Sequence, residues 1–151
     1  MNTIPVNCYG VAAIVIKEER ILLLRRTGPL EGTWCYVAGK IEASEKAWQA
    51  ALREIKEETG LTPSELYSAD IQEQFYEIGR DSIWIAPVFV GYIFDEQEVK
   101  INEEHDDYRW VTTGEALQML SFPGQRKIIK HIEEEFIKKK PTGWLLIKQR
   151  G

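Results

Sequence analysis

Hydrophobic residues at the start of the chain form continuous runs rather than an alternating pattern. Residues 8–16 are almost wholly apolar, and residues 21–26 begin with four apolar residues before two arginines; the polar stretch 17–20 separates the two segments. Such runs, bounded by a turn, are typical of buried strands that pair as a hairpin. Gly28, Pro29 and Gly32 then predict a loop, and residues 33–37 a short strand that ends at Ala38-Gly39.

Helical spacing is clearest over residues 44–59. One face of this predicted helix is apolar and comprises Ala47, Trp48, Ala51, Leu52 and Ile55. Ser44 is expected to cap the first turn, and Gly60 to end the helix.

The second half of the chain predicts further strands and then two helices. Strands are expected over residues 70–78 and 82–94, with Pro87 indicating an edge or a bulge, and over 108–111. Thr113 is expected to cap a helix that runs through Leu120, and Pro123 to begin a last helix. Residues 144–148 predict a final strand or a docked tail. This order favours an α/β or α+β fold with the sheet between helices.

Size, charge and cysteines narrow the class of protein. The 151 residues fit a single domain, 1–151. The net charge of −5 argues against binding of duplex nucleic acid or of a membrane surface, and a polyanionic substrate would need a divalent cation. Cys8 and Cys35 are interpreted as reduced, mostly buried thiols, and no signal peptide is evident, so a cytoplasmic location is expected.

Three glutamates of the predicted helix crowd together. An α-helix turns about 100° per residue, so Glu54 and Glu58 are neighbours and Glu57 lies beside them. On the same helical wheel, Glu54 and Glu58 border the apolar face. Like charges at this spacing destabilise a helix by about 0.2–0.5 kcal/mol per pair, a cost that a bound cation would offset. Carboxylate oxygens suit Mg²⁺ or Mn²⁺, whereas charge alone favours a solvated acidic helix, because Glu-rich helices are common.

The residues around the cluster extend it into a long motif. The motif begins at Gly39, and Glu45 follows after five residues of any type. Seven further residues of any type precede Arg53-Glu54. A hydrophobic residue and one residue of any type then lead to Glu57-Glu58, and one more residue of any type leads to Gly60 and the hydrophobic Leu61. This spacing matches every fixed position of the box that defines the Nudix hydrolases. The chain therefore resembles that family, and its other predicted elements follow the family's order.

The resemblance implies a fold and a chemistry. The expected fold is an α/β/α sandwich with a mixed sheet, and the expected reaction is cleavage of a diphosphate linked to another group. By resemblance, the metal ligands are Glu54, Glu57 and Glu58, with the carbonyl of Gly39. Arg53 would orient a neighbouring glutamate, and Glu45 would form an ion pair or an outer contact. The general base stays open among the glutamates, with Glu57 and Glu54 as candidates.

A subgroup of the family is the best match. Many members read Pro-Gly-Gly before the box, whereas this chain reads Val37-Ala38-Gly39. In this it is similar to the dATP and dihydroneopterin triphosphate pyrophosphohydrolases. Those relatives also carry a Glu-His pair before a Trp-containing strand, and this implies Glu104 as a further metal ligand. His105 and His131 are each expected to be structural or exposed.

Substrate contacts are predicted from position. Lys40 and Arg26 are candidates for phosphate binding, and Arg25 could exchange roles with Arg26 because strand alternation places one on each face. Tyr76 lies where some Nudix proteins carry a residue that marks the substrate class. A stacking surface for a base is expected from among the aromatic residues Trp34, Tyr36, Phe75, Tyr76 and Trp84, most of which belong in a core.

The sequence therefore predicts a Mg²⁺-dependent hydrolase, with Mn²⁺ as the alternative ion. It would convert a nucleoside triphosphate, or a similar nucleotide polyphosphate, to a monophosphate and pyrophosphate. A dinucleoside polyphosphate or a nucleotide sugar is the alternative substrate, and an inactive nucleotide-binding module of the same fold is a third reading. A homodimer is compatible with the resemblance.

Overall fold

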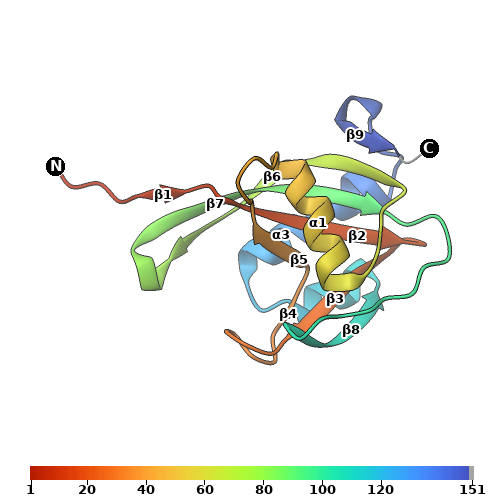
Figure 1. The fold of residues 1–151 in the computed structure, drawn as a ribbon, viewed down its shortest axis with the longest axis horizontal. Helices are drawn as coiled ribbons and strands as arrows, with labels where there is room; N and C mark the ends of the chain where they lie inside the picture. The colour runs from red at the N-terminus through yellow and green to blue at the C-terminus, as the bar shows by residue number, and fades with distance from the viewer. Residues whose placement is uncertain (150–151) are drawn as a thin grey trace.

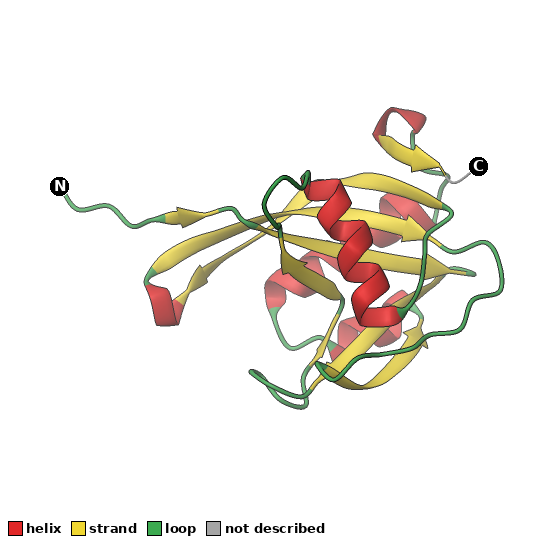
Figure 2. Cartoon of the chain, in the orientation of Figure 1, coloured by secondary structure: helices red, strands yellow, loops and turns green. Residues whose placement is uncertain are grey.

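A mixed β-sheet lies between α1 on one face and α2 and α3 on the other (Figures 1 and 2). The computed structural model describes residues 1–149, so the last two residues of the predicted 1–151 domain lie outside the described part. The helices are α1 (Ala47–Thr59), α2 (Thr113–Met119) and α3 (Pro123–Ile132). The strands are β1 (Val6–Asn7), β2 (Gly10–Lys17), β3 (Arg20–Arg26), β4 (Trp34–Cys35), β5 (Val37–Lys40), β6 (Glu65–Glu77), β7 (Ser82–Tyr92), β8 (His105–Val111) and β9 (Leu146–Gln149).

The sheet combines parallel and antiparallel pairs. Within residues 1–149 its main order is β4-β3-β2-β7-β6-β9, with β5 paired to β2, β8 to β3 and β1 to β7. The pairs β2–β7 and β1–β7 are parallel, whereas the other pairs are antiparallel. The predicted α/β sandwich with a mixed sheet is therefore confirmed.

The continuous apolar runs are explained by burial on both faces of the sheet. In β2, Ala12, Ile14 and Ile16 pack beneath α2 and α3. The alternate residues Val11, Ala13 and Val15 pack beneath α1. A central strand covered on both sides has no solvent face, so it shows no polar alternation.

Helix α1 begins later than the sequence predicts. Ser44 adopts a left-handed conformation with φ of 68°, and the helix starts at Ala47 after Lys46. The Gln49 side chain accepts a hydrogen bond from the Lys46 backbone N–H at 2.8 Å, so Ser44 is not the cap. The predicted end is confirmed, because Gly60 takes the left-handed conformation and its N–H bonds the Lys56 carbonyl.

One more predicted helix boundary shifts, by one residue. Thr112, rather than Thr113, caps α2, since Thr112 and Glu115 form a reciprocal capping box. The last helix begins at Pro123 as predicted and continues as a π-helical segment over Glu133–Ile137. The C-terminal strand is β9, which pairs with the edge of β6.

Strands β6 and β7 continue beyond the sandwich as an extended arm that β1 joins (Figure 1). The expectation of an edge at Pro87 is wrong, because β7 lies inside the sheet. Pro87 lies between the segment that pairs with β1 and the segment that pairs with β2. The irregularity lies opposite it, in β6 between Ser68 and Gln72.

The two thiols differ in exposure. Cys35 is buried, as expected, but Cys8 is exposed, since it lies between β1 and β2 rather than within a strand. None of the helices formed by residues 1–149 has the length and apolar character needed to cross a bilayer.

Candidate active site

A cavity of about 690 Å³ opens at the end of α1 where β3, β5 and β8 meet. Most residues of the predicted site reach it. Its lining comprises Arg26, Thr27, Gly28, Pro29, Cys35, Tyr36, Ala38, Gly39, Lys40, Glu54, Glu58, Trp84, Glu103, Glu104 and His105.

Glu58 is the most deeply buried acidic residue of this cavity. Only 2% of it is exposed, and its Oε2 atom has no hydrogen-bond partner among the described residues. Burial first, and then the neighbouring carboxylates of Glu54 and Glu104, raise the pKa of Glu58 well above its ordinary value of 4.5. An unpaired carboxylate oxygen in such a place is costly unless something positive binds it.

Glu54 reaches the cavity across a glycine. A Cβ atom added to Gly39 would lie 2.2 Å from the Glu54 Cδ atom, so only glycine leaves room for this carboxylate. The position of Gly39 in β5 and the position of Glu54 in α1 are thereby linked. This contact explains physically why the motif begins with a glycine.

Glu104 and His105 approach Glu58 from outside the helix. Ligand atoms of these three residues all lie within 4.8 Å of one another, which makes them a group that could hold a metal ion. The expectation for His105 was a structural or exposed side chain, and the structure places it in this cluster, only 8% exposed. Burial first, and then Arg26, lower the pKa of His105, which favours the neutral ring.

Arg53 joins the loop before α1 to the acidic face of the helix. Its Nε and Nη2 donate to the two carboxylate oxygens of Glu45 at 2.7 and 3.0 Å. Its Nη1 donates to Glu54 at 2.7 Å and to Glu57 at 3.1 Å, and Nη2 also donates to the Lys40 carbonyl. The hydrogen bond to Glu45 is the largest cause that raises the pKa of Arg53, and it lowers the pKa of Glu45.

Glu57 lies outside the cavity, although the Arg53 Nη1 atom donates both to it and to Glu54. Its side chain is 53% exposed and pairs with Arg53, and it is absent from the cavity lining. The helical turn explains the difference, because Glu57 lies about 100° from Glu58 around the axis. The roles predicted for Glu57 as a metal ligand and base stay predictions.

The cavity rim carries two positive groups, Arg26 and Lys40. The Nε atom of Arg26 donates to the Pro29 carbonyl at 3.0 Å, and this bond orients the guanidinium. Arg25 takes the other face, where its Nε pairs with Asp106 at 2.7 Å. Of the two arginines that the sequence left interchangeable, Arg26 therefore lies at the cavity.

Tyr76 does not line this cavity. It lies on the arm, is 51% exposed, and its hydroxyl donates to Asp81 at 2.6 Å. Its assignment as a substrate-binding residue stays a prediction. Two other aromatic candidates, Tyr36 and Trp84, do line the cavity.

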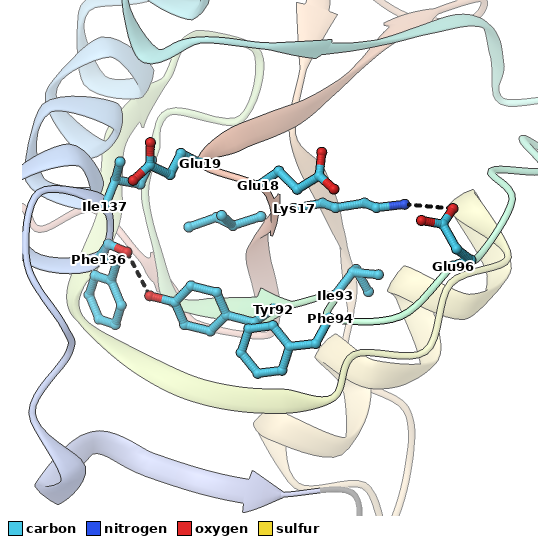
Figure 3. A pocket seen from close by; sticks show the side chains of 10 residues that line it. Lys17, Glu18, Glu19, Tyr92, Ile93, Phe94, Glu96, Phe136 and Ile137 are labelled. Carbon is cyan, nitrogen blue, oxygen red and sulfur yellow. Dashed lines mark hydrogen bonds and ion pairs between the residues drawn. The ribbon is translucent and has the colours of Figure 1, made fainter.

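A second cavity differs in chemistry (Figure 3). Its walls include the stacked rings of Tyr92 and Phe94, and the Tyr92 hydroxyl donates to the Phe136 carbonyl at 2.7 Å. Lys17 pairs there with Glu96 at 3.5 Å. The acidic cluster that could hold a metal ion lies in the first cavity, which is therefore the candidate active site.

Comparison with known proteins agrees with this geometry. The model of the NUDIX domain family matches residues 7–132. An octanoyltransferase of Myxococcus xanthus is 35% identical over 130 residues, which span 83% of this chain and 36% of that protein. The nucleoside triphosphatase NudI of Escherichia coli is 36% identical over 92 residues, which span 56% of this chain and 64% of that protein. The match thus spans less than two thirds of either relative.

Solved structures share the same architecture. The MutT protein of Methanosarcina mazei Go1 superimposes with a TM-score of 0.72 at 29% identity, covering 89% of this chain and 97% of that one. The dihydroneopterin triphosphate pyrophosphohydrolase of Escherichia coli has a TM-score of 0.69 at 22% identity, with coverages of 89% and 95%, and shows the fold alone. The chain belongs to the Nudix family.

Proposed function

We propose that this protein is a Mg²⁺-dependent hydrolase that converts a nucleoside triphosphate, or a similar nucleotide, to a monophosphate and pyrophosphate. The observation that carries the proposal is the buried Glu58 carboxylate, which lies beside Glu54 and Glu104 and whose Oε2 atom has no hydrogen-bond partner among the described residues. Arg26 and Lys40 stand on the rim of the same cavity. This arrangement would combine a cation site with a phosphate site.

The residues present fit a divalent metal ion. A buried carboxylate oxygen without a partner, together with nearby carboxylates, is the donor set that Mg²⁺ prefers. Glu54, Glu58 and Glu104, with the Gly39 carbonyl, would hold the ion. When bound, Mg²⁺ neutralises phosphate charge and makes a bound water a better nucleophile.

The side chains of the cavity would perform the other parts of the reaction. Arg26 and Lys40 would bind phosphate oxygens through charge-assisted hydrogen bonds. One glutamate would accept the proton of the attacking water. The water oxygen then bonds to phosphorus, the bridging P–O bond breaks, and pyrophosphate leaves with the electron pair. Arg53 would keep Glu54 oriented throughout, because it contacts both this carboxylate and the loop.

The names of relatives support this substrate class. NudI is called a nucleoside triphosphatase, and the similar region covers 56% of this chain. The alternative substrates, dinucleoside polyphosphates and nucleotide sugars, stay under test. An Ap4A hydrolase of Caenorhabditis elegans shares the fold at only 19% identity, which favours no substrate.

A substrate panel tests the proposal. The purified protein is incubated with Mg²⁺ and, in separate reactions, with ribo- and deoxyribonucleoside triphosphates, a dinucleoside tetraphosphate and ADP-ribose. Released pyrophosphate and phosphate are measured separately. We expect pyrophosphate from at least one triphosphate, abolition by E58Q, and no change in E134Q, whose carboxylate pairs with Lys138 far along the last helix. Absence of turnover on every triphosphate would contradict the proposal.

A further inference from the structure

His105 gives the acidic cluster a nitrogen donor. Its Nε2 atom lies 3.8 Å from the Glu58 Oε1 atom and 3.8 Å from the Cys35 Sγ atom. Its Nδ1 atom is buried and has no hydrogen-bond partner among the described residues. The His105 ring and the Glu58 carboxylate, both more than nine-tenths buried, therefore face one another through Nε2 and Oε1. The second carboxylate oxygen, Glu58 Oε2, has no hydrogen-bond partner among the described residues and is free to bind an ion.

The separation of these atoms is close to that of two ligands on one ion. With bonds of about 2.0–2.1 Å from a tetrahedral ion to nitrogen and oxygen, the two ligand atoms lie roughly 3.4 Å apart. The observed 3.8 Å between His105 Nε2 and Glu58 Oε1 is larger by only a few tenths of an ångström. Glu104 supplies a further oxygen within 4.8 Å of the other ligand atoms.

The donor type sets the preferred metal. Mg²⁺ takes oxygen ligands and keeps several waters, whereas an imidazole nitrogen favours ions such as Co²⁺ and Zn²⁺. A buried ring nitrogen is of little use to Mg²⁺ but adds a bond for these ions. Cys35 stays outside the ligand set, because its S–H is directed to the Leu24 carbonyl at 3.5 Å.

We propose that Glu58, Glu104 and His105 form a mixed nitrogen–oxygen site that binds Co²⁺ or Zn²⁺ more tightly than Mg²⁺. The site shares two carboxylates with the Mg²⁺ site of the proposed function, so the two kinds of ion compete for it. The inference rests on the geometry of the cluster and holds whether or not the chain hydrolyses nucleotides.

Proton NMR with Co²⁺ as the probe tests whether the ion binds beside His105, and the chain's two histidines give few ring signals to assign. Ligation by the ring itself is tested by the affinity of H105N, measured by calorimetry. His131 serves as the internal control, since one of its ring nitrogens contacts the Ala69 carbonyl at 2.6 Å, outside the cavity. We expect paramagnetic Co²⁺ to shift or broaden the ring signals of His105 and to leave those of His131 in place, with H131N used for assignment. Unperturbed His105 signals at saturating Co²⁺ would overturn the inference.

Calorimetry with the metals alone provides the second test. We expect wild-type protein to bind Co²⁺ at least about tenfold more tightly than Mg²⁺, and H105N to lose about tenfold or more in Co²⁺ affinity. Mg²⁺ affinity should change less than about twofold, and H131N should match wild type for both ions. Equal losses for both metals in H105N would mean that His105 acts only as a structural residue. If the wild-type protein binds Co²⁺ no more tightly than Mg²⁺ but still releases pyrophosphate from a nucleotide, this inference is wrong and the proposed function stands.

Discussion

Gly39 of β5 and Glu54 of α1 approach so closely that the strand backbone leaves no room for a side chain beside the carboxylate. A Cβ atom at residue 39 would stand 2.2 Å from Glu54 Cδ and 2.4 Å from Glu54 Oε1. Cβ atoms do not come this close to atoms to which they are not bonded, so any side chain at residue 39 must displace the carboxylate. The first residue of the motif, Gly39, is thus in direct contact with Glu54 in the middle of α1.

Replacement of Gly39 by alanine is therefore expected to impair the site more than the fold. Because the added methyl group displaces Glu54, G39A should lower metal affinity and turnover by roughly 100-fold, while costing about 1–3 kcal/mol of stability. Calorimetry with Mg²⁺ and urea unfolding measure the two effects. G79A is the matched control, since nothing lies within 4 Å of a Cβ atom there. Equal behaviour of the two variants would contradict this account.

Arg53 is expected to require its guanidinium and not only its charge. Lysine cannot reproduce the two parallel hydrogen bonds to Glu45 while also reaching Glu54 and the Lys40 carbonyl. R53K should therefore lose roughly 10- to 100-fold in kcat with its circular dichroism unchanged. R80K, at an exposed arginine of the arm, should keep wild-type kcat. Full activity in R53K would show that charge alone suffices.

Removal of the metal is expected to lower the thermal stability of the protein, and this effect should depend on Glu58. A ligand that binds only the folded state stabilises it, so saturating Mg²⁺ is expected to raise the Tm of the wild-type protein, and EDTA to reverse the effect. E58Q should show no such shift, because it lacks the buried carboxylate. Differential scanning calorimetry with and without Mg²⁺ is the measurement. A metal-dependent shift that survives in E58Q would place the stabilising ion elsewhere.

The two thiols should differ in reactivity. Cys8 is exposed, whereas Cys35 is buried and burial raises the pKa of its thiol to about 12. A thiol reagent at pH 8 is expected to modify one cysteine rapidly in the folded protein and both in denaturant. C8S should show almost no rapid reaction before unfolding. Rapid labelling of Cys35 in folded C8S would mean that this part of the cavity opens readily.

Glu73 predicts a pH dependence of stability. Burial raises the pKa of its carboxyl, although the hydrogen bond from the Tyr36 hydroxyl opposes the shift. A raised folded-state pKa means that this group's contribution is fully present below its unfolded pKa near 4.5 and is lost as pH rises through the folded value. The stability of E73Q relative to wild type should therefore increase between pH 4.5 and pH 8. Urea unfolding of both proteins at the two pH values measures this, and a constant difference would contradict it.

The local sequence pattern predicted a strand or a helix end correctly where a single interaction determines that element. The double-sided burial of β2 shows directly as a continuous apolar run, and Gly60 ends α1 because its lack of a Cβ permits the left-handed turn. Ser44 misled the prediction, since a serine before a helix usually caps it. Here the ion pair of Glu45 with Arg53 and the left-handed turn at Ser44 delay the helix.

By itself, the sequence determined the family, the mixed α/β architecture and the grouping of the glutamates, because periodicity and motif spacing are local properties of the chain. Only the tertiary structure decided which of these side chains share a cavity. In the tertiary structure Glu58 is buried, whereas Glu57 is half exposed and pairs with Arg53. Arg26, and not Arg25, lines the cavity. The tertiary structure also brought His105 to Glu58 from 47 positions further along the chain, a juxtaposition that depends on strand pairing between β3 and β8 and has no local signature.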